Sequence, residues 1–246
     1  MKPIISPVGD CAISIDFGQV IDPKINRHIR QTIERIRALQ LDGIIELVPT
    51  YCALLLQYDA MLYSYAELCN IIEPTLEQTV TDNANELVTV VEIPTVYGGE
   101  FGPDLGFVAS HNNLTEDEVV AIHSGTDYLV YMLGFIPGFT YLGGMDPRIA
   151  TPRLSSPRTL IPAGSVGIAG AQTGTYPSDS PGGWQIIGRT PVTMYDMSKK
   201  QAALLSAGDY VRYVPIDEAE YNRIKALGAD YAPSMYEVEV GELRGY

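Results

Sequence analysis

The stretch Pro162-Ala-Gly-Ser-Val-Gly-Ile-Ala-Gly-Ala-Gln-Thr-Gly174 is the most informative segment for the fold of this 246-residue chain. Its four glycines follow one another at spacings of three, three and four residues. Glycine permits positive φ angles and a close approach of the backbone to other groups. Two interpretations stay open: the glycines form corners of a small β-barrel, or their backbone amides cradle a substrate. The spacing matches neither the GxGxxG fingerprint nor a GxxxxGK[ST] P-loop, so we expect no ATP site in this chain alone.

Short runs that are typical of β-strands surround this stretch and alternate with Gly/Pro turns. These runs are Tyr128–Phe135, Ser165–Ala169, Trp184–Ile187, Val192–Asp196 and Asp209–Pro215. Many short strands with turn residues between them favour a closed barrel or a sandwich. A helix at Asp217–Leu227 and an alternating edge strand at Met235–Leu243 are expected to follow.

The residues before this region predict a separate, smaller unit with the order β-β-α-β-β-α. The predicted strands and helices are Ile4–Val8, Ala12–Phe17, a helix with N-cap Asp22 that ends near Gly43, Ile44–Val48, Ala53–Tyr58, and a helix over residues 61–76. The polar residues 79–86 are the best linker candidate. The fold class is therefore α+β, with an N-terminal α+β domain at residues 1–82 and a β-rich domain at residues 83–246.

The composition limits the classes of partner. The chain carries 30 acidic and 16 basic side chains, a net charge of −14. Such a surface repels phosphate backbones and anionic lipid, so we expect no nucleic acid and no membrane as partner. Three scattered cysteines without CxxC spacing favour reduced thiols and a cytoplasmic location.

Residues 128–190 differ from the rest of the chain in charge. They contain no Lys or Glu, and their four arginines outnumber two aspartates for a net charge of +2, whereas the other 183 residues sum to −16. The arginines are Arg148, Arg153, Arg158 and Arg189. Guanidinium groups in a locally positive zone suit an anionic ligand. The alternative is that these arginines only cap loops and bind backbone carbonyls.

The segment Tyr131-Met-Leu-Gly-Phe-Ile-Pro-Gly-Phe-Thr-Tyr-Leu-Gly-Gly144 combines aromatic residues with rigid turns. Phe135, Phe139 and Tyr141 are expected to line one wall of a substrate pocket, because Gly/Pro loops rarely carry three aromatic side chains without a function. The alternative is that these rings belong to the core.

Candidate catalytic groups are few. His123, directly before the β-rich region, is the best candidate for a general acid or base, although a lone histidine is often a structural hydrogen-bonding residue. The motifs HExxH, GxSxG and SxxK do not occur, and the histidine spacing predicts no metal site. So small a set of catalytic groups indicates that a partner protein completes the site.

Six motifs in a fixed order carry a specific resemblance. They are Val48–Tyr51, Tyr97–Leu105, Tyr131–Gly144, Ala150–Arg153, Pro162–Gly174 and Ser180–Pro191. These motifs closely resemble the 5-oxoprolinase B-subunit family, which is also called the KipI or allophanate hydrolase subunit 1 family. The likeness extends over nearly the whole chain.

The resemblance implies a small N-terminal α+β domain followed by a cyclophilin-like β-barrel domain. It also implies a non-autonomous subunit that works with two companions, a KipA-like C-subunit and an A-subunit. Together they would hydrolyse 5-oxo-L-proline to L-glutamate with ATP and Mg²⁺. Two other roles that the resemblance allows are inhibition of a sporulation-type histidine kinase and participation in a urea carboxylase or allophanate pathway.

For the lactam reaction, the resemblance and the residue pattern together suggest roles for several side chains. Arg189 or Arg153 would hold the substrate carboxylate, and backbone amides near Gly167 and Gly170 would face the developing oxyanion. His123, with Tyr131 or Gln172, would orient protons and water.

Overall fold

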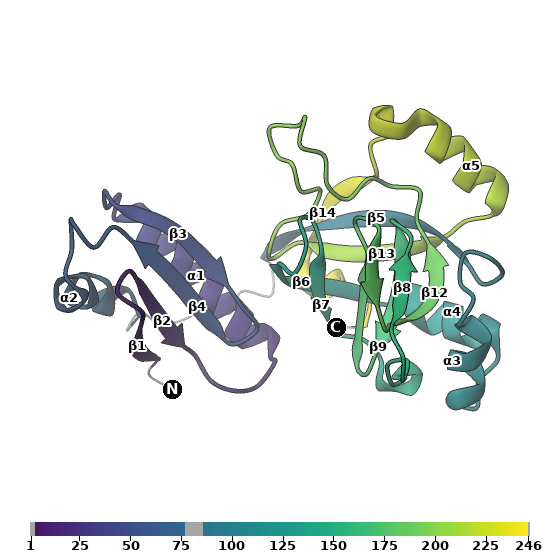
Figure 1. Cartoon of the computed structure of the whole chain (residues 1–246), viewed down its shortest axis with the longest axis horizontal. Helices are drawn as coiled ribbons and strands as arrows, with labels where there is room; N and C mark the ends of the chain where they lie inside the picture. Colours follow the sequence, from purple (N-terminus) through teal and green to yellow (C-terminus); the bar gives the residue numbers. More distant parts are fainter. Residues whose placement is uncertain (1–2, 77–85, 246) are drawn as a thin grey trace. The chain divides into compact units, whose positions relative to one another are not determined.

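The computed structural model describes residues 3–76 and 86–245. Contacts between residues divide the chain into two compact units, Met1–Asn83 and Ala84–Tyr246 (Figure 1). The boundary expected between residues 82 and 83 falls in the segment 77–85, which lies outside the described residues. The two units are described separately below.

The first unit contains a four-stranded antiparallel sheet with the strand order β1-β2-β4-β3. Its elements are β1 (Ile4–Val8), β2 (Ala12–Asp16), α1 (Pro23–Ala38), β3 (Ile44–Pro49), β4 (Ala53–Tyr58) and α2 (Tyr65–Leu76). The carboxylate of Asp22 caps α1 by accepting from the backbone N–H of Lys24, and Pro23 occupies the first turn, where its missing N–H costs nothing. The predicted order β-β-α-β-β-α is therefore confirmed.

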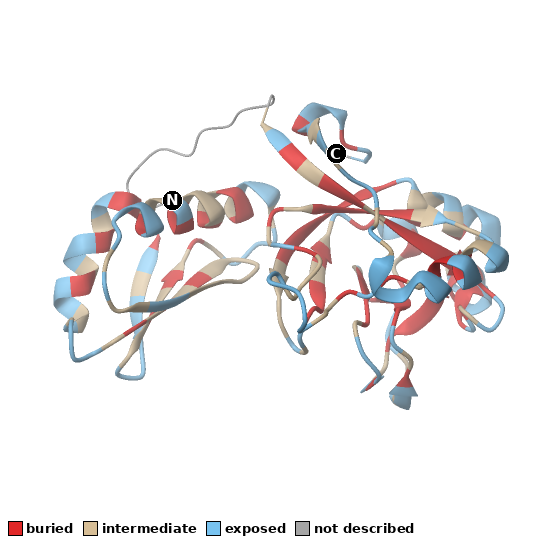
Figure 2. Cartoon of the chain, turned by 90° about the horizontal axis from the view of Figure 1, so that it is seen from above, coloured by how far each residue is buried: buried red, intermediate tan, exposed pale blue. Residues whose placement is uncertain are grey.

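The helices of the first unit cover one face of its sheet. Isoleucines at spacings of four and three residues, Ile29, Ile33 and Ile36, form a buried apolar stripe on α1, which packs with Leu54 and Leu56 of β4 in one cluster. Figure 2 shows buried and exposed positions alternating along the helices of the first unit. The second helix begins at Tyr65, four residues later than predicted, because residues 59–62 form a separate turn.

The second unit contains most of the strands. Its elements are β5 (Leu87–Tyr97), α3 (Leu105–His111), α4 (Glu116–Ser124), β6 (Asp127–Leu133), β7 (Thr140–Gly143), η1 (Pro147–Ile149), β8 (Arg158–Ile161), β9 (Ser165–Ala169), β10 (Gln172–Thr175), β11 (Ser180–Gly182), β12 (Gln185–Arg189), β13 (Tyr210–Pro215), α5 (Glu218–Leu227), η2 (Gly228–Asp230), β14 (Met235–Glu239) and η3 (Val240–Glu242).

Seven of these strands form a curved sheet in the order β10-β9-β12-β5-β13-β6-β7. Its two end strands, β10 and β7, contact each other. At Gly174 a Cβ atom would lie 3.3 Å from the backbone oxygen of Thr140, so the two strands lie closely side by side. The sheet is thus a nearly closed barrel, filled by residues such as Ile93, Val130 and Ile168. The predicted fold class, an α+β unit followed by a β-barrel domain, is confirmed.

The longest strand, β5, organises the barrel. It pairs with β12 near its end, in parallel with β13 along its length, and with β14 near its start. The predicted edge strand at the C-terminal end is therefore confirmed, although it stops at Glu239.

The predicted strand Val192–Asp196 is wrong. This segment buries Val192 and Met194, but it makes only an isolated bridge between Tyr195 and Ala203. Its backbone bonds to residues 202–204 of the following loop instead of to the barrel ladder. The alternation of apolar and polar residues therefore reflects the burial of two side chains and not the pairing of a strand. The short elements α3, β7, β8, β10 and β11 were not predicted.

Candidate functional site

A pocket of about 190 Å³ opens beside the aromatic segment of the second unit. Its lining residues are Phe135, Phe139, Tyr141, Arg153, Tyr176, Pro181, Gly182, Gly183 and Trp184. Four of the predicted substrate-binding residues, the three aromatic side chains of the β6–β7 region and Arg153, are therefore brought together. Pockets that bind drug-sized ligands have volumes of roughly 300–1,000 Å³. This pocket is smaller, so it suits a molecule smaller than a drug.

Phe139 is the centre of the pocket's aromatic wall. Its ring centroid lies 5.2 Å from that of Tyr141 and 5.7 Å from those of Tyr176 and Trp184, all in edge-to-face or near-perpendicular arrangements. Edge-to-face pairs of this kind are attractive because the positive ring edge meets the negative ring face. Phe139, Tyr176 and Trp184 are buried together in one cluster, so the wall is rigid.

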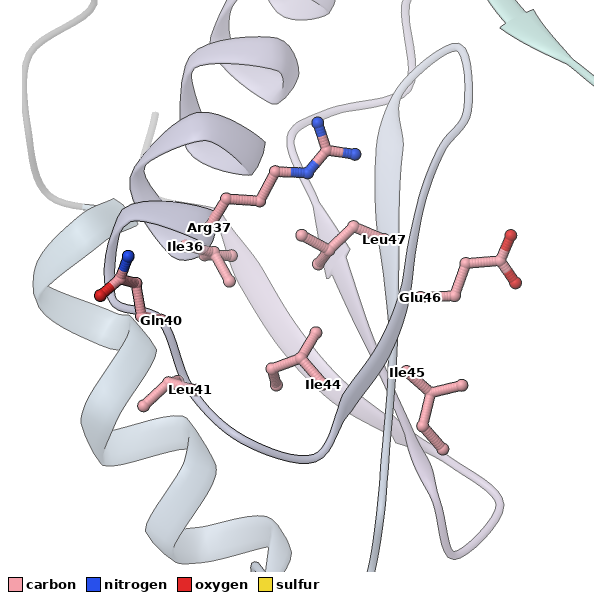
Figure 3. Close-up of a pocket in the computed structure, with 8 residues that line it drawn as sticks. All are labelled: Ile36, Arg37, Gln40, Leu41, Ile44, Ile45, Glu46 and Leu47. Carbon is pink, nitrogen blue, oxygen red and sulfur yellow. The ribbon is translucent and has the colours of Figure 1, made fainter. Parts of the chain in front are cut away.

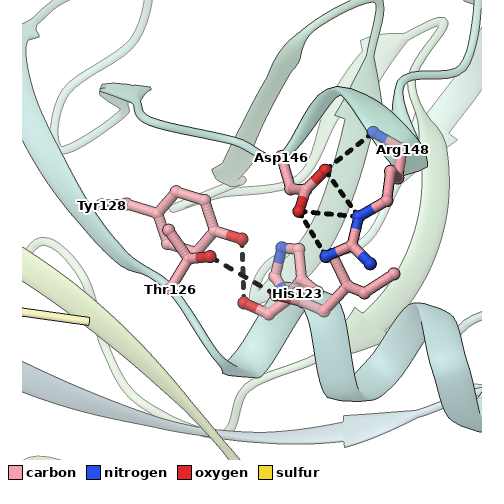
Figure 4. Close-up of polar contacts among 6 residues, drawn as sticks. His123, Thr126, Tyr128, Asp146 and Arg148 are labelled. Carbon is pink, nitrogen blue, oxygen red and sulfur yellow. Dashed lines mark hydrogen bonds and ion pairs between the residues drawn. The ribbon is translucent and has the colours of Figure 1, made fainter. Parts of the chain in front are cut away.

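Two of the four arginines of this region are held by acidic side chains. Arg148 forms an ion pair with Asp146 at 2.6 Å on the surface (Figure 4). Arg158 forms one with Asp104 at 2.7 Å, where both side chains are at least two-thirds buried. The guanidinium groups of these two arginines are therefore engaged by partners within the chain.

The other two arginines have no ion-pair partner among residues 3–76 and 86–245. The guanidinium carbon of Arg153 lies 6.0 Å from the centroid of the Trp184 ring, and that of Arg189 lies 5.9 Å from the centroid of Phe101. Arg153 lines the pocket, whereas Arg189 does not. A guanidinium that stacks on an aromatic ring keeps its N–H donors free for an anion. Arg153 is thus the cation best placed to bind a carboxylate in this pocket.

The ion pair between Arg158 and Asp104 positions the tryptophan of the pocket. Arg158 donates to the backbone oxygen of Trp184, and the second carboxylate oxygen of Asp104 accepts from the backbone N–H of Ile186 at 2.6 Å. The two partners of the ion pair therefore hold the backbone directly after the Trp184 side chain, on either side of Gln185. This arrangement links the Tyr97–Leu105 motif to the pocket wall.

Tyr176 supplies a hydroxyl group at the pocket. Burial raises the pKa of the Tyr176 phenol to about 12, although Arg153 and Arg158 oppose this shift. The phenol therefore remains protonated at neutral pH and can donate a hydrogen bond to a ligand. A Cβ at Gly182 would lie 2.6 Å from the Tyr176 hydroxyl, so glycine is needed there to leave room for it.

His123 lies in the barrel core and does not line the pocket. Its Nε2 lies 2.8 Å from the hydroxyl of Thr173, which donates its own proton to the backbone oxygen of Gly167. We therefore assign the proton of the ring to Nε2, and Nδ1 accepts from the hydroxyl of Tyr97 at 2.8 Å. The backbone oxygen of His123 accepts from Tyr128 (Figure 4). Burial lowers the pKa of His123 to about 3. Its acid/base role stays a prediction.

Tyr131 and Gln172 also lie outside the pocket lining. Tyr131 is buried at an irregularity of the β6–β7 pairing and lies against Gly143, where a Cβ would come within 2.2 Å of its ring. Gln172 is half-buried at the start of β10. The catalytic roles of both residues stay predictions.

The two predicted glycines occupy different environments. Gly167 lies in β9, between two neighbouring strands, and a Cβ there would come within 3.3 Å of the Trp184 side chain. Gly170 adopts a φ of 60° in the turn between β9 and β10, and its N–H donates to the backbone oxygen of Thr151 at 2.7 Å. An oxyanion role for Gly170 stays a prediction that would require this bond to open.

Five pocket residues were missed as site residues from the sequence: Pro181, Gly182, Gly183 and two aromatic residues, Tyr176 and Trp184. Trp184 is the only tryptophan of the chain, and it follows two glycines within a quoted motif. A single large aromatic residue behind a glycine pair was a usable signal. Tyr176 had no comparable signal, because its place in the wall depends on pairing between distant strands.

The first unit has a larger pocket of about 410 Å³ (Figure 3). Its lining comes from the end of α1, the following loop and β3: Ile36, Arg37, Gln40, Leu41, Ile44, Ile45, Glu46 and Leu47. None of the predicted site residues lies there, and the lining includes no His, Cys, Ser or Tyr that could act as a nucleophile or acid/base group. We therefore regard the aromatic pocket of the second unit as the candidate site.

Two other kinds of feature are absent from the described part of the chain. Residues 3–76 and 86–245 contain no group of three or more His, Cys, Asp and Glu side chains arranged to hold a metal ion. In the same residues, no helix combines the length and apolar character needed to cross a bilayer.

Comparison with known proteins supports the resemblance. Residues 3–205 match the family described as carboxyltransferase domain, subdomain C and D. The chain is 45% identical over 231 residues to the 5-oxoprolinase B-subunit of Bacillus subtilis, which covers 90% of this chain and 96% of that protein.

Solved structures show the same fold within longer chains. TTHA0988 is 36% identical with a TM-score of 0.73, covering 84% of this chain and 40% of that chain. The urea amidolyase of Kluyveromyces lactis, at 21% identity and a TM-score of 0.78, covers 96% of this chain and 16% of that chain, a likeness of fold alone. The sequence matches extend over both units, and the chain therefore belongs to the 5-oxoprolinase B-subunit family, within the family of carboxyltransferase domains C and D.

Proposed function

We propose that this chain is a non-autonomous subunit of an ATP-dependent 5-oxoprolinase, and that its aromatic pocket binds 5-oxo-L-proline. The companion proteins would be a C-subunit, which completes the cavity, and an A-subunit. The relatives that carry the name of the 5-oxoprolinase B-subunit support this role.

One observation carries the proposal: a guanidinium without an acidic partner among the described residues lies at the edge of a small aromatic pocket. 5-Oxoproline is a small ring with one carboxylate, so its anion matches Arg153 and its ring matches the wall formed by Phe139 and Trp184. A charge-assisted, two-pronged bond between guanidinium and carboxylate would fix the orientation of the ring.

The neighbouring side chains would act on the amide end of the substrate. The protonated phenol of Tyr176 would donate a hydrogen bond to the lactam carbonyl oxygen, the atom on which negative charge develops. Such a donor polarises the carbonyl but cannot itself break a stable lactam. This chain would therefore bind and orient the substrate, and the bond-breaking step would require groups from the companion proteins.

ATP with Mg²⁺ is proposed for the assembled complex and not for this chain. The pocket is lined by aromatic, proline and glycine residues and one arginine, and no Asp or Glu lines it to hold a magnesium ion. When bound to the complex, ATP would supply a phosphoryl group that activates the lactam oxygen.

A second candidate function is a role in carboxylation of a urea-like amide. The description of the matching family as a carboxyltransferase domain favours it. Urea carries no carboxylate, however, so this function would leave Arg153 without its proposed ligand.

The test is ATP-dependent release of glutamate from 5-oxoproline by the purified chain alone, with the C-subunit, and with both the C- and A-subunits. We expect release only when all three proteins are present. Carboxylation of urea by the complex, with no glutamate release, would favour the second candidate. Release of glutamate by the chain alone would contradict a non-autonomous role. Inhibition of a sporulation-type histidine kinase without either activity would favour the KipI-like alternative.

A further inference from the structure

Phe135 differs from every other aromatic residue of the pocket in its exposure. Its side chain is 68% exposed, whereas Phe139, Tyr176 and Trp184 are buried. Its ring still contacts the wall, at 5.8 Å and 80° from the ring of Phe139. Phe135 therefore stands on the rim of the pocket, with most of its apolar surface in water.

The backbone at Phe135 has an unfavourable conformation. Its φ angle is +70°, in the left-handed region that non-glycine residues rarely adopt. The N–H of Ile136 donates to the backbone oxygen of Gly134 at 2.9 Å, so Phe135 is the central residue of the rare and strained form of the γ-turn. Strained residues persist where the surrounding structure holds them, and they are frequent at functional sites.

The surrounding structure does hold this turn. The N–H of Gly134 donates to the backbone oxygen of Phe139, and the N–H of Phe139 donates to that of Ile136. At Gly138, with a φ of +82°, a Cβ would lie 2.6 Å from the Cβ of Tyr195, so the loop packs tightly against its neighbour. The Phe135 ring is therefore presented on a fixed support.

Further apolar surface adjoins the same rim. Pro181 lines the pocket and is exposed. The pairing of β11 with β8 places Pro181 opposite residues 159 and 160, and Leu160 is 57% exposed. The exposed residues Phe135 and Pro181 thus line the same pocket, and the exposed Leu160 lies on the strand that pairs with Pro181, in a segment that carries a net charge of +2 in an acidic protein.

We propose that Phe135 is an anchor for the companion polypeptide that completes the pocket. This inference rests on the proposed function. The partner surface would be an apolar socket wide enough for a phenyl ring, with a neutral or acidic rim that suits the local positive charge. Exposed aromatic residues on rigid supports are typical binding hot spots, since little conformational entropy is lost when they are buried.

The experiment measures the affinity of the purified chain for the C-subunit by calorimetry, without ATP or 5-oxoproline. Phe135→Ala should raise Kd at least about 10-fold, because hot-spot truncations commonly have effects of this size or larger. Phe107→Ala is the matched control, since Phe107 is also an exposed phenylalanine but lies in the ordinary helix α3 outside the pocket. Its Kd should change less than about 2-fold.

A second variant separates anchoring from folding. Phe135→Gly removes the same ring, so it should raise Kd as much as Phe135→Ala does. Because glycine adopts a positive φ angle without strain, this variant should also raise Tm by about 2–4 °C. Unchanged Kd in both Phe135 variants would overturn the anchor, even if glutamate release by the complex fell. Equal weakening by Phe107→Ala would overturn it too. Because Kd is measured without substrate, either result leaves the proposed lactam reaction to its own test.

Discussion

The second unit contains two clusters of aromatic and polar side chains that differ in how their polar groups are satisfied. Around His123, both ring nitrogens have partners, and the ring lies fully buried among Tyr97, Tyr128 and Tyr213. In the aromatic pocket, Arg153 lines a cavity without an ion-pair partner among the described residues. Polar groups that satisfy each other stabilise the fold, whereas a charged group left free beside a cavity can bind a ligand.

The largest expected effect tests the cluster of satisfied polar groups around His123. His123→Ala should lower the free energy of unfolding by about 3 kcal/mol, because it leaves a cavity and removes the partners of the Tyr97 and Thr173 hydroxyls. Chemical denaturation of the purified chain measures this. The matched control is His111→Ala, an exposed histidine at the end of α3, which should change the value by less than about 0.5 kcal/mol. Equal losses in both variants would contradict the comparison.

The next effect tests Arg153 in the aromatic pocket. Arg153→Ala should lower kcat/KM of the assembled complex for 5-oxoproline about 100-fold, since a charge-assisted bond to the carboxylate is lost. Arg148→Ala removes an arginine whose partner is Asp146, and it should stay within about 2-fold of wild type. A complex that keeps full activity with Arg153→Ala would remove this residue from the site.

The pH dependence of stability tests the burial of His123. Burial lowers its pKa from 6.5 to about 3, so between these pH values the unfolded chain binds a proton that the folded chain does not. The free energy of unfolding should therefore be complete above pH 6.5 and fall as the pH drops, by about 2 kcal/mol at pH 5 from this group. Chemical denaturation at several pH values from 7.5 to 4.5 gives curves of the free energy of unfolding against pH. The wild-type curve should fall more steeply with decreasing pH than the curve of His123→Gln. Parallel curves would show that His123 is not buried as a neutral ring.

The smallest expected effect concerns the support of the pocket wall. Asp104→Asn removes the charge that pairs with Arg158, and it should cost about 1–2 kcal/mol of stability. Because Trp184 is the only tryptophan, its fluorescence should shift to longer wavelength as its backbone support loosens. Asp146→Asn, at the exposed pair, should change neither property. A fluorescence shift in both variants would argue against a specific link from Asp104 to Trp184.

Local sequence patterns were sufficient to predict most of the fold. The stripe of α1, the strands β1 to β4 and the helix α5 follow from periodicity and capping residues, which act over a few positions. The segment Val192–Asp196 shows where this reasoning fails. Its alternation reflects the burial of two side chains in the core, but strand pairing depends on which distant backbone lies alongside, and no local pattern reports that.

The candidate site could be predicted only in part, because it also depends on contacts between segments that are distant in sequence. Phe135, Phe139 and Tyr141 lie close together in sequence, so a local motif could group them, and the local charge pointed to a set of four arginines that includes Arg153. Which arginines are free could not be predicted, because Asp104 pairs with Arg158 across 54 residues of sequence. The acid/base role of His123 was inferred from its residue type and its position directly before the β-rich region, and neither of these reports whether the ring is buried.

The pairing of β5 has a consequence for how the barrel can be made. This strand begins at Leu87, but two of its three neighbours, β13 and β14, lie at residues 210–215 and 235–239. During synthesis, β5 leaves the ribosome more than a hundred residues before these neighbours, so its backbone hydrogen-bonding groups and apolar side chains stay without their final partners until β13 and β14 are made. A chain cut after residue 205, where the family match ends, would lack both strands. Such a truncation should yield an aggregating product in which the first unit can still fold, because all four strands of its sheet precede residue 59.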